Sequence, residues 1–153
     1  MNKFKNLKKI LIHFFPIFIS CNLYAKNCEI NISGTDMMKF DKKIIDVKGS
    51  CKSFKILLKH TGKLQKNVMG HNIVIVKTKD LEMVTSKINM SHGFSEGFLP
   101  DLNEVLFKSP IIGGGEEIIL EIETEKLMKD TNYTFFCSFP GHFVIMKGVV
   151  RIL

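Results

Sequence analysis

The sequence has 153 residues, of which 45% are hydrophobic and 24% charged, and a formal net charge of +7. This length and composition fit one folded domain rather than a disordered or multidomain chain. The positive charge is concentrated at the N-terminus. The sequence has no lysine cluster interleaved with aromatics and no glycine-rich phosphate loop, so it gives no indication of nucleic-acid or nucleotide binding.

The first 25 residues have the pattern of a secretory signal peptide. Met1 to Lys9 contains four lysines and no acidic residue, and Ile10 to Leu23 is mostly apolar. That apolar run is too short to span a bilayer comfortably, and Ala25 is a suitable small residue before a cleavage point. We therefore expect residues 1–25 to be removed on export to the periplasm. Loss of the four lysines lowers the formal charge of the domain, residues 26–153, from +7 to +3.

A second form of export stays open. Phe18-Ile19-Ser20-Cys21 is similar to a lipoprotein cleavage site, at which the cysteine is acylated. Cys21 is thus an alternative lipid anchor, although phenylalanine is unusual at the first position of such a site. Beyond this anchor the mature chain contains no apolar run that could span a membrane.

Short runs of alternating or β-branched residues, separated by turn residues, follow the signal. This pattern predicts an all-β, antiparallel sandwich. Gly34, Gly49, Gly62 and residues 113–115 are expected to mark turns. The expected strands span residues 28–32, 44–47, 53–60, 72–77, 117–124, 132–138 and 147–153.

The connection formed by residues 78–103 interrupts this pattern. The apolar spacing in Asp80-Leu81-Glu82-Met83-Val84 permits one short helix. We expect the connection to be a loop elaboration outside the sandwich.

The C-terminal region combines three soft metal donors. Once Cys21 is removed, three cysteines remain, so two can pair and one is left over in an oxidising compartment. Cys137, His142 and Met146 are spaced by five and four residues around Pro140-Gly141. A thiolate, an imidazole and a weak thioether suit a copper ion that must be stable as both Cu(I) and Cu(II).

A second imidazole is needed for a trigonal copper site. His71, directly before an apolar strand, is the obvious donor, and Gly70 would let a backbone carbonyl approach the metal closely. Zinc is a chemical competitor for such a pocket, and a buried inert thiol is the bland alternative for Cys137. The other methionines are scattered, which argues against copper storage.

These motifs give the chain a specific resemblance to the azurin family. Asn67 to Asn72 reads Asn-Val-Met-Gly-His-Asn, and Phe135 to Met146 contains Phe-Phe-Cys-x-Phe-Pro-Gly-His with methionine four residues later. The resemblance implies a Greek-key β-sandwich of the cupredoxin type, with about eight strands and one short helix in the 78–103 connection. It also implies one type 1 copper ion held by His71, Cys137, His142 and Met146, with the Gly70 carbonyl as a distant axial contact.

The resemblance assigns further roles around this site. The backbone amides of Asn72 and Phe139 would hydrogen-bond to the Cys137 sulfur and tune the reduction potential. Cys28 and Cys51 would form a structural disulfide at the opposite end of the sandwich. The apolar patch through which electrons enter and leave would consist of Leu64, Val68, Met69, Phe139, Pro140 and Val144.

The implied function is one-electron transfer by a monomer, without catalysis. Transient partners would be redox proteins such as c-type cytochromes and terminal reductases. A copper oxidase or reductase is the enzymatic alternative, but such enzymes commonly connect a second copper through a histidine beside the cysteine, whereas Phe136 and Ser138 flank Cys137. Copper delivery is the remaining alternative, which a reversible redox couple and slow metal exchange would distinguish from electron transfer.

Overall fold

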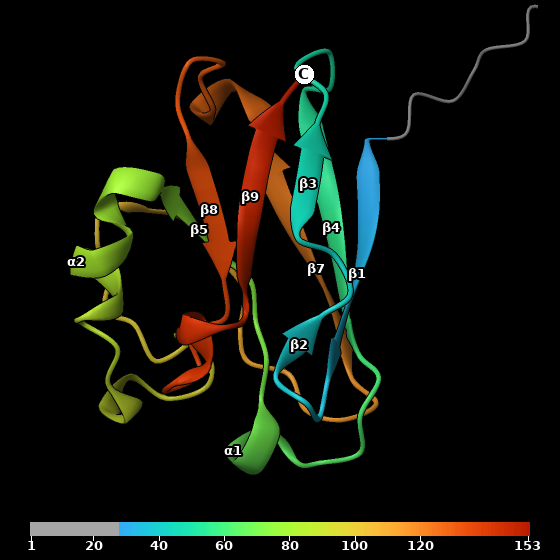
Figure 1. The fold of residues 1–153 in the computed structure, drawn as a ribbon, viewed down its shortest axis with the longest axis vertical. Coiled ribbons are helices and arrows are strands. Elements are labelled where there is room, and N and C mark those ends of the chain that lie inside the picture. The colour runs from blue at the N-terminus through green and yellow to red at the C-terminus, as the bar shows by residue number, and fades with distance from the viewer. Residues whose placement is uncertain (1–27) are drawn as a thin grey trace, which may run out of the picture.

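The computed structural model describes residues 28–153 (Figure 1). The expected signal peptide, residues 1–25, and the alternative anchor Cys21 lie outside the described residues. Nine strands form two sheets that pack face to face, which confirms the predicted all-β sandwich. The first sheet has the order β2-β1-β4-β7, and its strands are β1 (Glu29–Thr35), β2 (Lys39–Phe40), β4 (Ser53–His60) and β7 (Glu117–Glu123).

The second sheet has the order β3-β9-β8-β5-β6. Its strands are β3 (Ile44–Val47), β5 (Val74–Lys77), β6 (Val105–Lys108), β8 (Tyr133–Phe136) and β9 (Lys147–Ile152). The prediction of an antiparallel sandwich was wrong for two pairs, because β1 pairs with β4 and β3 pairs with β9 in parallel. The other pairs are antiparallel.

The alternation of side chains in β4 explains the core. Phe54, Ile56, Leu58 and His60 are buried, whereas Lys55 and Lys59, at alternate positions, are exposed. Successive side chains of a strand point to opposite faces, so one face of β4 enters the sandwich and the other meets water. On the wet face Lys59 lies opposite Glu117 of β7.

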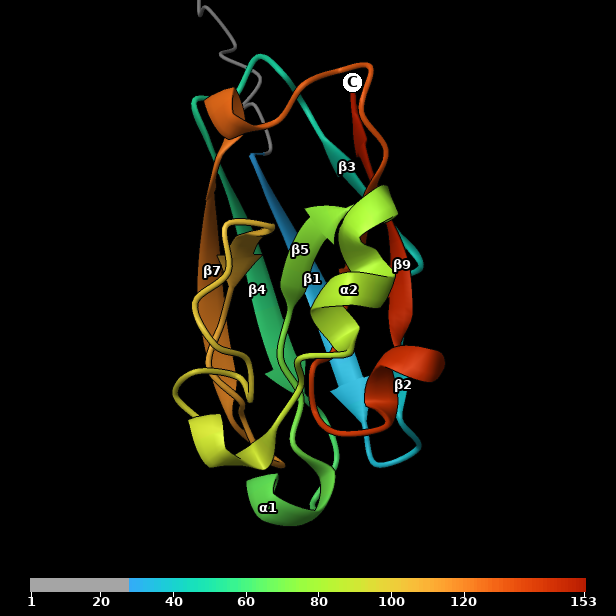
Figure 2. The same ribbon diagram turned by 90° about the vertical axis from the view of Figure 1, so that its left-hand side faces the viewer.

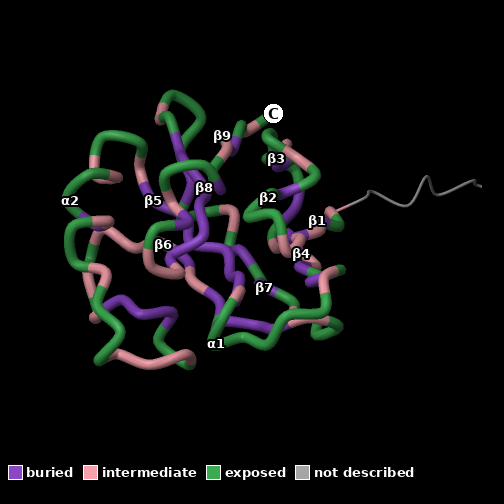
Figure 3. Tube along the Cα trace, turned by 60° about the horizontal axis from the view of Figure 1, so that its bottom comes forward, coloured by how far each residue is buried: buried purple, intermediate pink, exposed green. Residues whose placement is uncertain are grey.

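Strand β5 is buried on both faces, because a loop elaboration covers its outer side. Ile75 belongs to the central core, whereas Val74 and Val76 pack with Val84 in a second cluster. Val84 lies in α2 (Leu81–Thr85), which is the helix predicted within residues 78–103. Figure 2 shows α2 lying over β5, outside the sandwich, and Figure 3 shows the buried residues concentrated on the strands.

Some elements differ from those expected. The short strands β2 and β6 were not predicted, nor was the helix α1 (Lys66–Met69). The described part of the chain also contains four 3-10 helices: η1 (Thr78–Asp80), η2 (Met90–His92), η3 (Thr124–Lys126) and η4 (His142–Val144). Gly34 lies inside β1 rather than at a turn.

The disulfide and the metal-donor loops occupy opposite ends of the sandwich. Cys28 and Cys51 form the expected disulfide, and each precedes one of the parallel strands β1 and β4. The loop that joins β8 to β9 and the segment around α1 lie at the other end, away from the C-terminus (Figure 1). The fold thus brings the two segments that carry the predicted ligands to one place.

Candidate metal centre

Three predicted ligands converge at this end of the sandwich. The donor atoms of His71, Cys137 and His142 all lie within 4.8 Å of one another, and all three residues are buried. The Cys137 Sγ lies 3.9 Å from Nδ1 of His71 and 3.6 Å from Nδ1 of His142. This is the one group of its kind among the residues that the structure describes.

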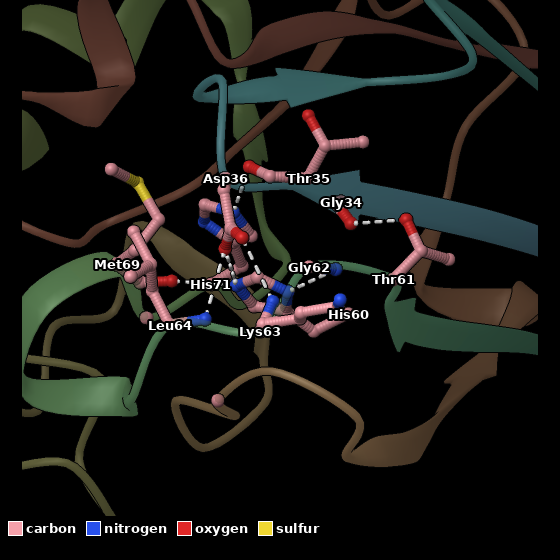
Figure 4. A network of polar contacts seen from close by, with 12 residues as sticks. Gly34, Thr35, Asp36, His60, Thr61, Gly62, Lys63, Leu64, Met69 and His71 are labelled. Atoms are coloured by element: carbon pink, nitrogen blue, oxygen red, sulfur yellow. Dashed lines mark hydrogen bonds and ion pairs between the residues drawn. The ribbon is translucent and has the colours of Figure 1, made fainter.

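The last residue of β1 orients the His71 ring. Nε2 of His71 donates a hydrogen bond to the Thr35 carbonyl oxygen at 2.8 Å (Figure 4), so Nδ1 carries the lone pair that faces Cys137. Gly34 makes room for the ring, because a Cβ at Gly34 would lie 2.6 Å from Cδ2 of His71. A histidine ring fixed by a backbone carbonyl on its far nitrogen is a common arrangement in metal sites.

A second, buried histidine supports His71 without contributing to the donor group. The His60 ring stacks on the His71 ring, and Nε2 of His60 donates to the Met69 carbonyl at 2.7 Å (Figure 4). The Asp36 carboxylate accepts hydrogen bonds from the backbone N–H groups of Lys63 and Leu64. These bonds lower the Asp36 pKa and fasten the segment before α1 to the β1–β2 turn.

The Cys137 loop is closed by its own backbone. Cys137 directly follows β8, and its N–H donates to the Met146 carbonyl at 2.9 Å. The Met146 N–H in turn donates to the His142 carbonyl at 2.8 Å. Gly141 adopts φ +84°, a conformation that glycine tolerates best, and it starts the short helix that carries His142. The sequence therefore folds this loop so that its histidine returns toward the cysteine.

Burial keeps the Cys137 thiol protonated in the metal-free protein. Desolvation raises the pKa of Cys137 to about 12, and the backbone amides of Asn72 and Phe139, which hydrogen-bond to the sulfur, oppose that rise. A cation that binds the thiolate must therefore displace a proton.

Burial also keeps both imidazoles neutral. Desolvation is the largest cause that lowers the pKa of His71 to about 4 and that of His142 to about 4. Neutral imidazole is the form that binds a metal. At neutral pH the two rings can therefore act as ligands without first losing a proton.

The donor geometry fits one small cation. Donors held about 2.0–2.3 Å from a shared ion at angles near 120° lie about 3.7 Å apart, close to the two sulfur–nitrogen distances above. One thiolate and two imidazoles in a site closed to solvent match the soft donor set that copper prefers. The residues present thus fit copper.

Of the two further groups expected to contact the metal, the Gly70 carbonyl lies near the Cys137 sulfur and Met146 hydrogen-bonds to Cys137 through its backbone. The Gly70 carbonyl oxygen is 3.8 Å from the Cys137 Sγ, and Met146 is fully buried in the same loop. A Cβ at Gly70 would meet Ile111 at 2.3 Å and the Lys66 carbonyl at 2.4 Å, so only glycine fits there.

The six residues of the expected apolar patch are all at least partly exposed, and Phe139 among them contacts His142. Leu64, Val68 and Val144 expose 41%, 56% and 59% of their surface, respectively, and Met69, Phe139 and Pro140 are half-buried. The Phe139 ring lies 4.5 Å from the His142 ring, centroid to centroid. His142 itself is only 3% exposed. A partner protein would therefore contact the residues around His142 rather than its ring.

Sequence reasoning missed several residues that shape the site. Thr35 acts through its backbone carbonyl, which no residue type reveals. Gly34 acts by lacking a side chain within a strand, and an unexplained glycine in a strand pattern is a weak signal of such a close approach.

Comparisons with known proteins agree with this geometry. Residues 26–153 match the family described as copper binding proteins, plastocyanin/azurin family. An azurin from Bordetella pertussis is 44% identical over 135 residues, which cover 88% of this chain and 89% of the relative. An azurin from Pseudomonas aeruginosa is 37% identical over 147 residues, covering 95% and 99% of the two chains. Among solved structures, an azurin from Methylomonas sp. strain J has a TM-score of 0.77 and 35% identity, covering 82% of this chain and 98% of that one.

Proposed function

The chain belongs to the plastocyanin/azurin family of copper-binding proteins, and from this premise we propose that it is a periplasmic, type 1 copper protein that shuttles single electrons between redox proteins. The cupredoxin type of sandwich expected from the sequence is confirmed by the likeness to a solved azurin. Copper is the cofactor of the family, and the converging donors described above provide its site.

The residues that would hold copper are His71, Cys137 and His142, with Met146 and the Gly70 carbonyl as weaker contacts. When bound, copper supplies a centre that alternates between Cu(II) and Cu(I). The protein's part is to hold the donors in one arrangement for both states. His71 is fixed by Thr35 and His60, and Cys137 by the backbone of its own loop.

Electron exchange is proposed to occur at the apolar patch around His142. The patch consists of Leu64, Val68, Met69, Phe139, Pro140 and Val144. A largely apolar surface without ion pairs permits brief docking, and small interfaces are typical of redox encounters. Buried, neutral ligand rings beneath the patch leave little water to reorganise when the charge at the site changes.

Electron transfer is favoured over a copper-dependent oxidation or reduction of a substrate. Phe136 and Ser138, the neighbours of Cys137, contain no ligand that could lead to a second copper ion. We therefore propose a carrier that makes and breaks no substrate bond.

The location and partners follow from the same proposal. The sequence of residues 1–25 supports export, with a lipid anchor at Cys21 as the alternative. Within residues 28–153 the structure has no helix that is long and apolar enough to cross a membrane. We propose a monomer that docks transiently with c-type cytochromes and reductases.

An absorption spectrum after Cu(II) loading of residues 26–153 tests this function. The expected result is an intense red-visible band that disappears with ascorbate and returns on oxidation. Cys137→Ser is the matched control, because it removes the thiolate and should bind Cu(II) without that band. A colourless copper-loaded protein would refute the proposal.

A further inference from the structure

A turn formed by residues 93–98, within the 78–103 connection, contacts the residues that follow Cys137. The Phe98 ring contacts the Phe139 ring edge to face, with centroids 5.6 Å apart and planes at 79°. Phe139 in turn contacts the His142 ring. Phe98 is only 1% exposed, although it belongs to a long connection outside the sandwich. This connection therefore forms part of the wall of the metal centre.

The backbone of this turn is held in an unusual conformation. Gly97 and Phe98 have φ values of +61° and +58°, and the described residues contain one other non-glycine residue with positive φ, Met38. Side chains other than glycine rarely adopt this region, so the surroundings must impose it. The Phe98 N–H donates to the Gly93 carbonyl, and the Phe98 carbonyl accepts from the Asn89 N–H.

A hydrogen-bond network makes a second contact between the turn and the Cys137 loop. The Ser138 hydroxyl donates to the Gly97 carbonyl. The Asn72 side chain contacts the same serine: its Nδ2 donates to the Ser138 Oγ at 2.8 Å, and its Oδ1 accepts from the Ser138 N–H at 2.8 Å and lies 3.1 Å from the Ser138 Oγ. A Cβ at Gly97 would lie 2.6 Å from the Asn72 Nδ2, so no other residue permits this approach.

The turn is also fastened to the sandwich. The Lys108 ammonium of β6 donates to the Glu96 carboxylate at 3.1 Å and to the Leu99 carbonyl at 3.3 Å. These two residues immediately precede and follow the Gly97-Phe98 pair. The Phe94 carbonyl accepts from the Ile111 N–H at 2.9 Å. The turn is thus attached on both sides of the point where it contacts Ser138 and Phe139.

We propose that residues 93–98 act as a clamp on Ser138 and Phe139, with Phe98 as a positioning residue that holds the Cys137 loop in its metal-binding shape before the metal arrives. Because the amide of Phe139 hydrogen-bonds to the Cys137 sulfur, fixing the Phe139 ring also fixes a donor to that sulfur. The Phe98 ring also fills space through which water would otherwise reach the Cys137 sulfur. The role of the clamp in copper binding rests on the proposed function. Its protection of the Cys137 thiol in the metal-free protein does not.

Alkylation of Cys137 by iodoacetamide in the metal-free protein tests the clamp. Cys137 is the only free cysteine among the described residues and is fully buried, so its alkylation reports opening of the loop. Phe98→Ala should raise the alkylation rate roughly tenfold or more, because the deleted ring leaves a cavity against Phe139. Phe98→Leu keeps apolar volume and should restore most of the protection.

Val84→Ala is the matched control. Val84 is buried in the same connection but packs in the cluster beneath α2, away from Phe139. Rates should be compared at urea concentrations that give equal global stability. Should Phe98→Ala react no faster than Val84→Ala there, Phe98 is only a core residue and the proposal is wrong.

Two further measurements keep the test decisive. If Phe98→Ala does not fold, Ser138→Ala removes the hydrogen bond to Gly97 and should raise alkylation about fivefold; an unchanged rate in that variant overturns the clamp. After Cu(II) loading, Phe98→Ala should shift the red-visible band and the reduction potential, whereas Val84→Ala should change neither. If the unaltered chain takes up no copper, the proposed function fails while alkylation still decides the clamp.

Discussion

His60 lies flat against His71, with ring centroids 4.3 Å apart and 11° between the ring planes. Both nitrogens of the His60 ring are used within the protein: Nε2 donates to the Met69 carbonyl, and Nδ1 accepts from the Gly62 N–H at 3.1 Å. The ring is fully buried. A histidine outside the donor group thus supports one inside it and joins the end of α1 to the end of β4.

Replacing His60 should destabilise the metal-free protein. His60→Leu keeps apolar volume but leaves the Met69 carbonyl and the Gly62 amide without their partners, at an expected cost of about 1–3 kcal/mol in the free energy of unfolding. Urea unfolding followed by circular dichroism measures this. His92→Leu, in the 78–103 connection, is the control and should change stability by no more than about 0.5 kcal/mol. Equal stability of the two variants would contradict the supporting role.

The stability of the metal-free protein should be greatest between about pH 6.5 and pH 9. The pKa of His71 and that of His142 are each lowered from 6.5 to about 4, so the unfolded chain binds more protons than the folded one between those values. Stability therefore falls as the pH drops from 6.5 to 4. The Cys137 pKa is raised from 9.0 to about 12, so the folded chain keeps a proton that the unfolded chain loses, and stability falls again from pH 9 to 12.

Urea midpoints measured across pH 4 to 12 check this profile. His71→Gln should weaken the acid limb, since one of the two buried imidazoles is gone. Cys137→Ser should remove this thiol's contribution to the alkaline limb. A profile that these substitutions leave unaltered would show that other groups control the pH dependence.

Removing the disulfide should lower stability and leave the metal site intact. Cys28 and Cys51 are 23 residues apart in sequence, and in the chain-entropy model a loop of this size is worth about 3 kcal/mol. The bond lies at the end of the sandwich opposite His71 and Cys137. The double variant Cys28→Ser/Cys51→Ser should therefore unfold at lower urea but keep the red-visible band of the copper-loaded protein. A changed band would mean that the two ends are coupled.

The sequence predicts those parts of the fold in which one residue type has one evident role. The alternation in Ser53 to His60 predicts β4 with its observed bounds, and the spacing of Cys137 and His142 predicts their convergence. The two-residue strand β2 was missed because so short a segment contains no periodic pattern. β6 was missed because its four residues are too few to show a period and directly follow a long connection.

Contacts made by the backbone, and contacts that the absence of a glycine side chain allows, could not be predicted. The Thr35 carbonyl orients His71 whatever its side chain, and Gly34 acts through the space it leaves. The clamp depends on positive φ at Phe98, where the residue type favours a different conformation. Such conformations are imposed by tertiary contacts, so they become visible only once distant segments are placed together.

Charge introduced into the apolar patch should slow electron exchange without altering the metal centre. Val144 is 59% exposed beside His142, so Val144→Asp places a charge where two copies of the copper-loaded protein would meet. The electron self-exchange rate, measured by NMR on mixtures of the oxidised and reduced protein, should fall by about tenfold or more at low salt and recover partly at high salt. The absorption band should stay unchanged.

Ile119→Asp is the matched control, because Ile119 is 58% exposed but lies on β7 in the other sheet. If both variants slow exchange equally, net charge rather than the patch governs the encounter, and the proposed docking surface is wrong.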